Sequence, residues 1–203
     1  MARIMNLFPV PVYFENCNFD YTEEFEFLKK QPSRIDDRKK KKQTSADTFL
    51  LKKPELKRLK DWIEITLDTF VKNVYKSQTE LYITQSWWNT IGFGGGLSAH
   101  HHPNSIISGV WYPEITMGQT PSIHFCNFQK SSNILLNVDD NNLYNSDTMY
   151  APIQSGNLIL FPSNLYHGVK PNTTDKNRYS LSFNTWTHSD LGSEFELTYC
   201  STK

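Results

Sequence analysis

Apolar side chains recur at helical spacing in one long stretch of the N-terminal half. From Pro54 to Lys76 they follow a largely 3.6-residue period, which predicts the longest helix of the chain, packed by its apolar stripe on the outside of a sheet. The stripe contains Leu56, Leu59, Trp62, Ile63, Ile65, Leu67, Phe70, Val71 and Val74. A shorter helix is predicted from Tyr21 to Lys30, because its acidic residues come early and its lysines late, as the helix dipole favours.

The pattern changes to strands after residue 80. Residues 81–90 form one predicted strand, and residues 178–186 alternate with a period of two, which is typical of a half-buried strand. Shorter strands are predicted at 122–128 and 157–160.

The first residues are rich in strand formers but interrupted by prolines. Pro9 and Pro11 restrict Ile4–Phe14 to an edge strand or an extended lead-in along the margin of the sheet. Aromatic residues make up 14% of the 203 residues, which favours a β-rich fold in one domain. We therefore expect a single domain over 1–203, with residues 1–80 supplying an N-terminal strand and helices that pack on the sheet.

Charge and cysteine content exclude several classes of protein. The net charge is zero, which gives no broad attraction to nucleic acid or to a membrane surface. No apolar run approaches the roughly 18–20 residues of a membrane span, and no signal-peptide pattern is present, so we expect a cytoplasmic protein. The three cysteines have wide, motif-free spacings and are interpreted as free thiols.

Two polar stretches are interpreted as loops. The basic run Arg38–Lys42 could dock phosphate, but such runs are more often solvated. The segment 129–149, rich in Asn and Asp, is either a lid or binding loop or a disordered connection.

Candidate chemistry begins with the histidine run His100–His102, which follows a run of glycines and precedes the apolar segment 106–112. In an extended strand His100 and His102 would share one face, with Cα atoms roughly 6.5 Å apart, and His101 would point away. We therefore expect the three histidines to lie at the start of a strand. Two neutral imidazoles suit iron, zinc, copper or nickel, and a further ligand must come from elsewhere in the chain.

His167 is the candidate for that further ligand, because it follows the apolar run 157–160. Eleven residues later Arg178 opens a strand whose polar face also contains Ser180, Ser182 and Asn184. A guanidinium in this row could hold a carboxylate through two hydrogen bonds, with a serine hydroxyl beside it.

Together these fragments resemble a known family. The order His-x-His-Pro, Ser-Gly-Val-x-Tyr, Gly-x-Leu-x-Leu-Phe-Pro, His and Arg-x-Ser-x-Ser-Phe-Asn, between Trp88 and Trp186, resembles the small 2-oxoglutarate- and Fe(II)-dependent oxygenases of marine bacteria and phages. The opening Leu7–Tyr13 is similar to the start of that group as well.

The resemblance implies a double-stranded β-helix, which is the jelly-roll also found in cupins. It implies that His100 and His167 bind Fe(II), that Arg178 and Ser180 hold 2-oxoglutarate, and that dioxygen is the oxidant. Relatives in the wider superfamily carry Asp or Glu where this chain has His102. Either His102 is the third ligand, or the iron has two protein ligands and a water.

Other residues are assigned supporting roles around this centre, and no catalytic residue is expected beyond the metal itself. Asn89, Tyr112 and Asn184 are candidates for the cosubstrate pocket, and Trp88 and Asn104 for the substrate pocket. Asn89 could instead cap a turn, and Tyr112 could be packing.

The favoured reaction is hydroxylation of an unidentified substrate, with a peptidyl side chain preferred by analogy with related folds. Nucleic acid is disfavoured, because basic residues are not interleaved with aromatic ones. Two alternatives stay open. One is a cupin-like metalloenzyme with a three-histidine site and no use for Arg178, and the other is a non-catalytic jelly-roll binding module.

Overall fold

Two antiparallel sheets and a layer of helices make up the computed structural model, which describes residues 3–34, 41–116, 123–127 and 137–202. The larger sheet has the order β1 (Tyr13–Asn16), β9 (Asn157–Pro162), β6 (Ile107–Tyr112), β11 (Arg178–Thr187), β4 (Leu81–Ile91), β3 (Lys42–Ser45) and β2 (Ser33–Arg34). The smaller sheet has the order β5 (Leu97–His100), β10 (His167–Val169), β7 (His124–Cys126) and β8 (Thr148–Tyr150). The prediction of a mainly β fold with flanking helices is confirmed.

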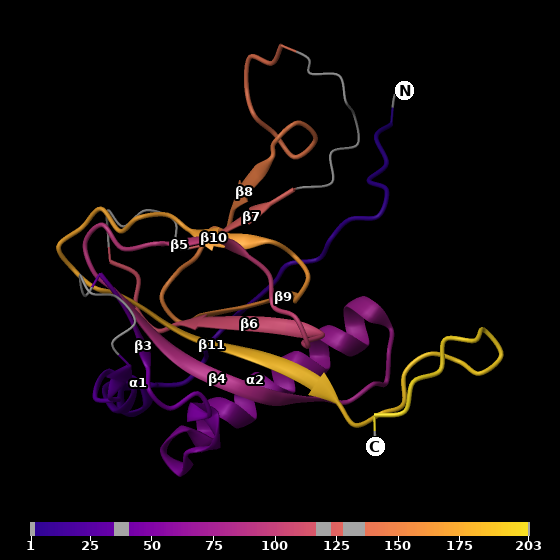
Figure 1. Cartoon of the computed structure of the whole chain (residues 1–203). Helices are drawn as coiled ribbons and strands as arrows, with labels where there is room; N and C mark the ends of the chain where they lie inside the picture. Colours follow the sequence, from indigo (N-terminus) through magenta and orange to yellow (C-terminus); the bar gives the residue numbers. More distant parts are fainter. Residues whose placement is uncertain (1–2, 35–40, 117–122, 128–136, 203) are drawn as a thin grey trace.

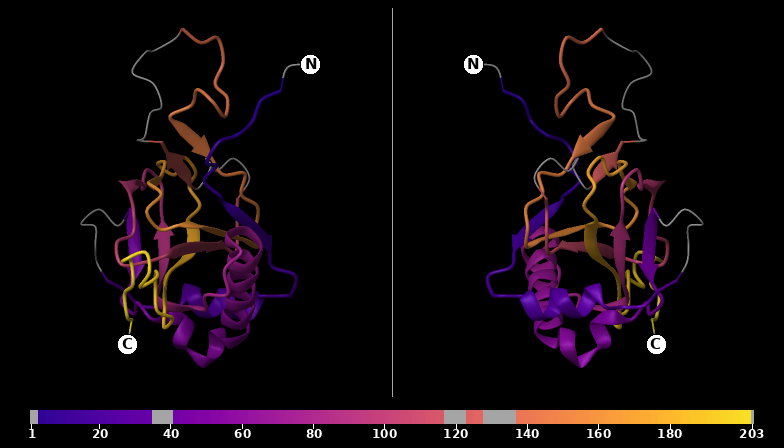
Figure 2. Two further views of the ribbon diagram at one scale, coloured as in Figure 1. Left: turned by 90° about the vertical axis from the view of Figure 1, so that its right-hand side faces the viewer. Right: turned by 90° about the vertical axis from the view of Figure 1, so that its left-hand side faces the viewer.

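The helices lie on the side of the larger sheet that faces away from the smaller one (Figures 1 and 2). These are α1 (Thr22–Lys29) and α2 (Lys57–Phe70), with short 3₁₀ segments at Leu50–Lys52 and Pro54–Leu56 and a π-helical turn at Val71–Tyr75. Both predicted helices are confirmed. Ile65 is 66% exposed, contrary to its place in the predicted stripe, because it lies about 200° around the helix from the buried Ile63.

Alternation along the strands of the larger sheet produces two separate cores. One core lies between the helices and one face of the larger sheet and contains Leu28, Leu50, Leu51, Leu56, Leu59, Ile63, Leu67, Phe70, Trp88, Ile107, Trp111, Leu158, Leu160, Leu181 and Phe183. The other face looks toward the smaller sheet, and its core contains Val110, Tyr112, Ile123, Phe125, Ala151, Ile159 and Phe161. Both faces of the larger sheet therefore contribute to a core.

The N-terminal strand lies at the edge of the larger sheet, as predicted. Pairing with β9 begins only at Tyr13, after the two prolines, and the preceding Leu7 and Phe8 side chains are exposed. A proline cannot donate to the strand ladder, which accounts for the late start.

The histidine run lies at the end of one strand, not at the start of another as predicted. β5 ends at His100, and β6 begins only at Ile107. Between them Pro103 cannot extend a ladder, and Asn104 takes a left-handed backbone with φ of 55°. The chain therefore turns directly after the histidines.

The two polar stretches lie partly outside the described residues. Of the basic run, residues 38–40 lie outside, while Lys42 opens β3. Of the segment 129–149, residues 129–136 lie outside, and its end forms part of β8. The predicted strand at 122–128 is observed at His124–Cys126, and its first and last residues are not described.

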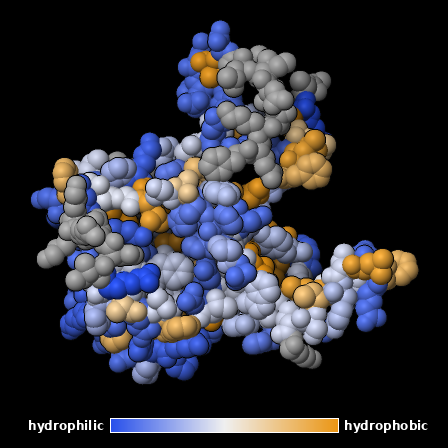
Figure 3. Space-filling model, viewed as in Figure 1, coloured by the Kyte–Doolittle hydropathy of each residue, from blue (hydrophilic) through white to orange (hydrophobic). Residues whose placement is uncertain are grey.

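The surface is hollowed between the region of β7 and β8 and the C-terminal segment (Figure 3). The C-terminal segment projects from the body as a loop closed by pairing of Leu191 with Cys200, and its tip exposes Phe195 and Leu197. Among the described residues, none of the helices combines the length and apolar character needed to cross a membrane.

Gly109 permits the close contact between β6 and β11. A Cβ atom at this position would lie 2.2 Å from Cζ of Phe183, which is fully buried. We expect Gly109→Ala to lower the free energy of unfolding by about 1–3 kcal/mol, measured by urea denaturation, because the ring has no room to move. The loss should be smaller when Phe183→Leu is the background. Equal losses in both backgrounds would contradict this contact as the cause.

Candidate metal centre

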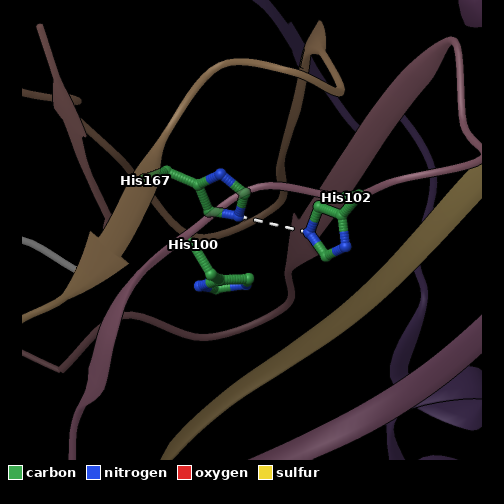
Figure 4. A group of neighbouring side chains, drawn as sticks. All are labelled: His100, His102 and His167. Atoms are coloured by element: carbon green, nitrogen blue, oxygen red, sulfur yellow. Dashed lines mark hydrogen bonds between the residues drawn. The ribbon is translucent and has the colours of Figure 1, made fainter. Parts of the chain in front are cut away.

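Three imidazoles from two segments far apart in the chain converge between the sheets. Antiparallel pairing of β10 with β5 sets His167 opposite His100, and His102 follows two residues later (Figure 4). The ring centroids of His167 lie 4.5 Å from His100 and 5.0 Å from His102, and one ligand atom from each residue lies within 4.8 Å of the others. His101 instead packs its ring 4.8 Å from Tyr166, so it lies outside the cluster.

Backbone carbonyls orient two of the three rings. Nδ1 of His100 lies 2.9 Å from the carbonyl oxygen of Ser98, and Nδ1 of His167 lies 2.9 Å from that of Leu165. A carbonyl can only accept, so Nδ1 carries the proton in both rings and Nε2 has the free lone pair. This is the arrangement by which proteins orient histidine ligands toward a metal.

Burial keeps two of the three imidazoles neutral at neutral pH. Burial lowers the pKa of His102 to about 3, and the neighbouring His167 and His100 lower it further. Burial also lowers the pKa of His167 to about 4, against the opposing effect of its hydrogen bond to Leu165. Neutral imidazole is the form that binds a metal ion, so these two residues need lose no proton at neutral pH to bind one.

Arg178 is a buried cation that lacks an acidic partner. Its side chain is 3% exposed, and its pKa is lowered by burial. Nη2 donates to the carbonyl of Lys170 at 3.3 Å, whereas the buried Nη1 has no hydrogen-bond partner among the described residues. No carboxylate in the described part of the chain forms an ion pair with it.

The predicted neighbours of Arg178 lie on the same face of the larger sheet. Ser180 pairs with Asn89 across β11 and β4, and Asn89 also donates to the hydroxyl of Ser182 at 3.3 Å. Tyr112 is buried, which raises its pKa, and the charge of Arg178 acts in the opposite direction. The structure therefore brings Arg178, Ser180, Asn89 and Tyr112 to one face.

Asn184 lies further along the same face, away from Arg178. Its Oδ1 accepts a hydrogen bond from the hydroxyl of Ser108 at 2.9 Å, and the residue is half-buried. The cosubstrate role assigned to Asn184 from the sequence stays a prediction.

The structure contradicts the predicted pocket role of Trp88, whereas that of Asn104 stays a prediction. Trp88 is 4% exposed and stacks on Tyr179 in the core under the helices. Adjacent residues of a strand point to opposite faces, so Trp88 cannot face the site if Asn89 does. Trp87 faces it instead, with its ring 5.8 Å from His102. Asn104 is an exposed turn residue.

His124 lies on the outer face of the smaller sheet, and its buried Nδ1 has no hydrogen-bond partner among the described residues. It pairs with Gly168 and with Tyr150, whereas the inward position beside it belongs to Phe125, opposite His167. Gly168 is required here, because a Cβ atom would lie 3.0 Å from the His124 ring.

The sequence profile of a family described as putative 2OG-Fe(II) oxygenase matches residues 85–184. This segment includes all three histidines and Arg178. A comparison with curated protein sequences finds no match.

Solved structures with the same fold include several proteins of low identity. HygX from Streptomyces hygroscopicus, solved with nickel, 2-oxoglutarate and hygromycin B bound, has a TM-score of 0.61 at 15% identity, over 88% of this chain and 83% of HygX. A Pseudomonas putida prolyl-4-hydroxylase has a TM-score of 0.57 at 9% identity, over 87% and 94% of the two chains. An oxidoreductase of the 2OG-Fe(II) oxygenase family from Burkholderia pseudomallei has a TM-score of 0.57 at 11% identity, over 80% and 75%. These similarities confirm the double-stranded β-helix.

The lowered pKa values predict a pH-dependent stability of the metal-free protein. In the unfolded chain His102 and His167 take up protons near pH 6.5, but in the folded protein only near pH 3–4. The free energy of unfolding should therefore fall as the pH is lowered from 7 to 5, by at most about 1.4 kcal/mol per pH unit for each histidine. Urea denaturation with a chelator present measures this slope. The His102→Gln and His167→Gln variants should each have a shallower slope, and unchanged slopes would contradict the assignment.

The two adjacent tryptophans should respond differently to the same substitution. Trp88→Ala should cost about 3–5 kcal/mol of stability, because it empties part of the core, and Trp87→Ala should cost clearly less. Bound Co²⁺ should quench the fluorescence of Trp87 through its proximity to the histidines. The quenched fraction should fall in Trp87→Phe and persist in Trp88→Phe, and the reverse result would contradict the facing of β4.

Proposed function

We propose that this chain, whose residues 85–184 belong to the family of putative 2OG-Fe(II) oxygenases, is a 2-oxoglutarate- and Fe(II)-dependent dioxygenase that hydroxylates its substrate. His100, His102 and His167 would hold the iron, and Arg178 the cosubstrate. Iron with 2-oxoglutarate and dioxygen supplies oxidation of an unactivated C–H bond, with 2-oxoglutarate converted to succinate and carbon dioxide.

The unpaired guanidinium of Arg178 is the observation that carries the proposal. Burial of an uncompensated charge costs several kcal/mol, so the site is suited to a ligand that brings the opposite charge. A carboxylate can accept from the free Nη1, in the two-point geometry that guanidinium favours. The hydroxyl of Ser180, which lies on the same face, would assist.

The three histidines fit a divalent transition metal. Their ligand atoms lie close together, and two of the rings already point Nε2 away from their backbone partners. We assign His102 as the third protein ligand, since its Nε2 lies 3.3 Å from that of His167, a separation suited to neighbouring positions on one ion.

A cupin-like enzyme without 2-oxoglutarate would have the same histidines but would leave Arg178 unexplained. A binding module without catalysis would explain neither the oriented rings nor the buried cation. The oriented histidine rings and the buried cation of Arg178 together favour the oxygenase.

We propose a peptidyl side chain as the substrate class. The similarity in fold to a prolyl-4-hydroxylase supports this choice. The half-buried Trp87 beside His102 offers an apolar surface on which an uncharged side chain can pack. Trp87 therefore takes the pocket role that the sequence suggested for Trp88.

The test is anaerobic addition of 2-oxoglutarate to the Fe(II)-loaded protein, followed by visible absorption. The wild type should develop the weak charge-transfer band of the chelate. Arg178→Ala should lose the band at cosubstrate concentrations that saturate the wild type, because its anchor is missing, while metal content stays unchanged. Once dioxygen is admitted, the variant should also lose succinate release.

The matched control removes a surface arginine, Arg3→Ala, which should behave as the wild type. Unchanged succinate release in Arg178→Ala would overturn the assigned anchor and favour a cupin-like reaction. Absence of the band in the metal-loaded wild type would overturn the oxygenase.

A further inference from the structure

A row of aromatic side chains leads away from the metal centre along the larger sheet. Trp87 stands at one end, with its ring 5.8 Å from that of His102. At the other end Tyr82 pairs with Trp186 across β4 and β11, and its ring stacks on that of His188 with centroids 4.1 Å apart. We call Trp87, Trp186, Tyr82 and His188 the aromatic stripe.

A bulge in β4 places both ends of the aromatic stripe on one face of the sheet. The pairing of β4 passes from Gln85 to Ile83 while β11 advances by one residue, so the alternation of β4 is reversed beyond this point. Leu81 and Ile83 pack against the core under the helices, so Tyr82 between them faces the side of the smaller sheet, as Trp87 does. Strict alternation without the bulge would have turned Tyr82 under the helices.

The length of the aromatic stripe limits what can cover it. Five residue steps separate Trp87 from Tyr82, which corresponds to about 15 Å along the strand. The rings of Trp87, Tyr82 and Trp186 are half-buried and that of His188 is exposed, so the stripe is open to a ligand. An extended peptide of about five residues matches this length, whereas a single side chain covers only one of the rings.

The segment that follows β11 adds negative charge at the far end of the aromatic stripe. Residues 188–202 contain Asp190, Glu194 and Glu196, and they contain neither lysine nor arginine. Glu194 and Glu196 are exposed, and neither forms an ion pair within the described part of the chain. This C-terminal segment therefore presents uncompensated carboxylates.

The opposite side of the hollow has the same sign of charge. The described residues around β7 and β8 include Asp139, Asp140 and Asp147 but no lysine or arginine, and they lie across the hollow from the C-terminal segment (Figure 3). The chain as a whole has a net charge of zero, so this is a local excess of negative charge. A cationic ligand is attracted to such a surface, and an anionic one is repelled.

We propose that the substrate is a polypeptide with lysine or arginine near the oxidised residue, and that it lies extended along the aromatic stripe toward the C-terminal segment. Its cationic side chains pack on the rings of Tyr82 and Trp186 and pair with Glu194 and Glu196. Aromatic rings alone would also suit a sugar or an uncharged peptide, but the carboxylates select a cation. The length of the stripe selects an extended chain. The inference rests on the proposed function and narrows its substrate class.

The test uses a fluorescein-labelled decapeptide of alternating lysine and proline, since proline keeps the chain extended. Fluorescence anisotropy measures its binding to the Ni²⁺-loaded protein with 2-oxoglutarate present. It should bind at least about tenfold more tightly than a glutamate–proline decapeptide, and about tenfold more weakly when the salt concentration rises from about 50 to about 200 mM. Lysine amide at the same total lysine concentration should compete at least about tenfold less well than unlabelled decapeptide, because it cannot span the stripe.

Paired variants locate the binding surface. The double variant Glu194→Gln, Glu196→Gln should weaken binding of the lysine–proline peptide about fivefold. The matched control Glu23→Gln, Glu55→Gln removes two exposed carboxylates from the helix layer and should bind as the wild type does.

Substitution of one ring tests the aromatic stripe itself. Trp186→Ala should weaken binding about three- to fivefold, because a cation loses the ring on which it packs, and Trp186→Tyr should retain most of the affinity. Circular dichroism verifies that both variants are folded. Equal affinity of Trp186→Ala and the wild type would overturn the placement of the peptide on the stripe.

The other outcomes separate this inference from the proposed function. Equal affinity for the lysine and glutamate peptides, with a normal charge-transfer band in the wild type, would overturn the basic substrate and retain the oxygenase. Equal competition by lysine amide would overturn the extended chain and favour a small cationic substrate. Equal weakening by the two double variants would overturn the role of the C-terminal segment. Absence of the band with the preference for lysine intact would overturn the oxygenase and retain this surface.

Discussion

The pairing of β10 with β5 is the constraint on which the site depends. It sets His167 directly opposite His100, although 66 residues of chain separate them. The same short strand pairs with β7 on its other side, and Gly168 allows that approach by leaving room for the His124 ring. A change of one residue in this register would turn His167 to the outer face and remove it from the cluster.

The larger sheet supplies the second half of the site by the same alternation. Leu181 and Phe183 of β11 enter the core under the helices, while Arg178, Ser180 and Ser182 face the smaller sheet. The long ladder between β11 and β4 fixes which side each residue takes. The core under the helices and the position of the buried Arg178 side chain therefore both depend on β11.

Much of this arrangement was predictable from the sequence, because it follows from periodicity. The spacing of apolar residues gave α2, and alternation placed Arg178 and Ser180 on one face of β11. The histidine cluster was predictable, because the motifs that contain His100, His102 and His167 follow one another along the chain in the order typical of the family that the sequence resembles. The pocket role predicted for Trp88 was wrong, because adjacent residues of a strand face opposite sides. Trp87, two residues before Asn89, shares the face of Asn89, and Trp88 does not. The turn after His100 was missed because Pro103 and Asn104 end the ladder within an otherwise strand-like run.

The three histidines bring no negative charge to their cluster, in contrast to sites in which a carboxylate is one of the ligands. A divalent ion held by neutral imidazoles keeps its full charge, and Arg178 adds a further positive charge on the face of the larger sheet that looks toward the smaller sheet. A dicarboxylate that contacts both would neutralise charge that the protein leaves unbalanced, so ion and diacid would strengthen each other's binding. Such coupling is reciprocal, and it would make loading of the centre respond to the cellular supply of the diacid as much as to that of the metal.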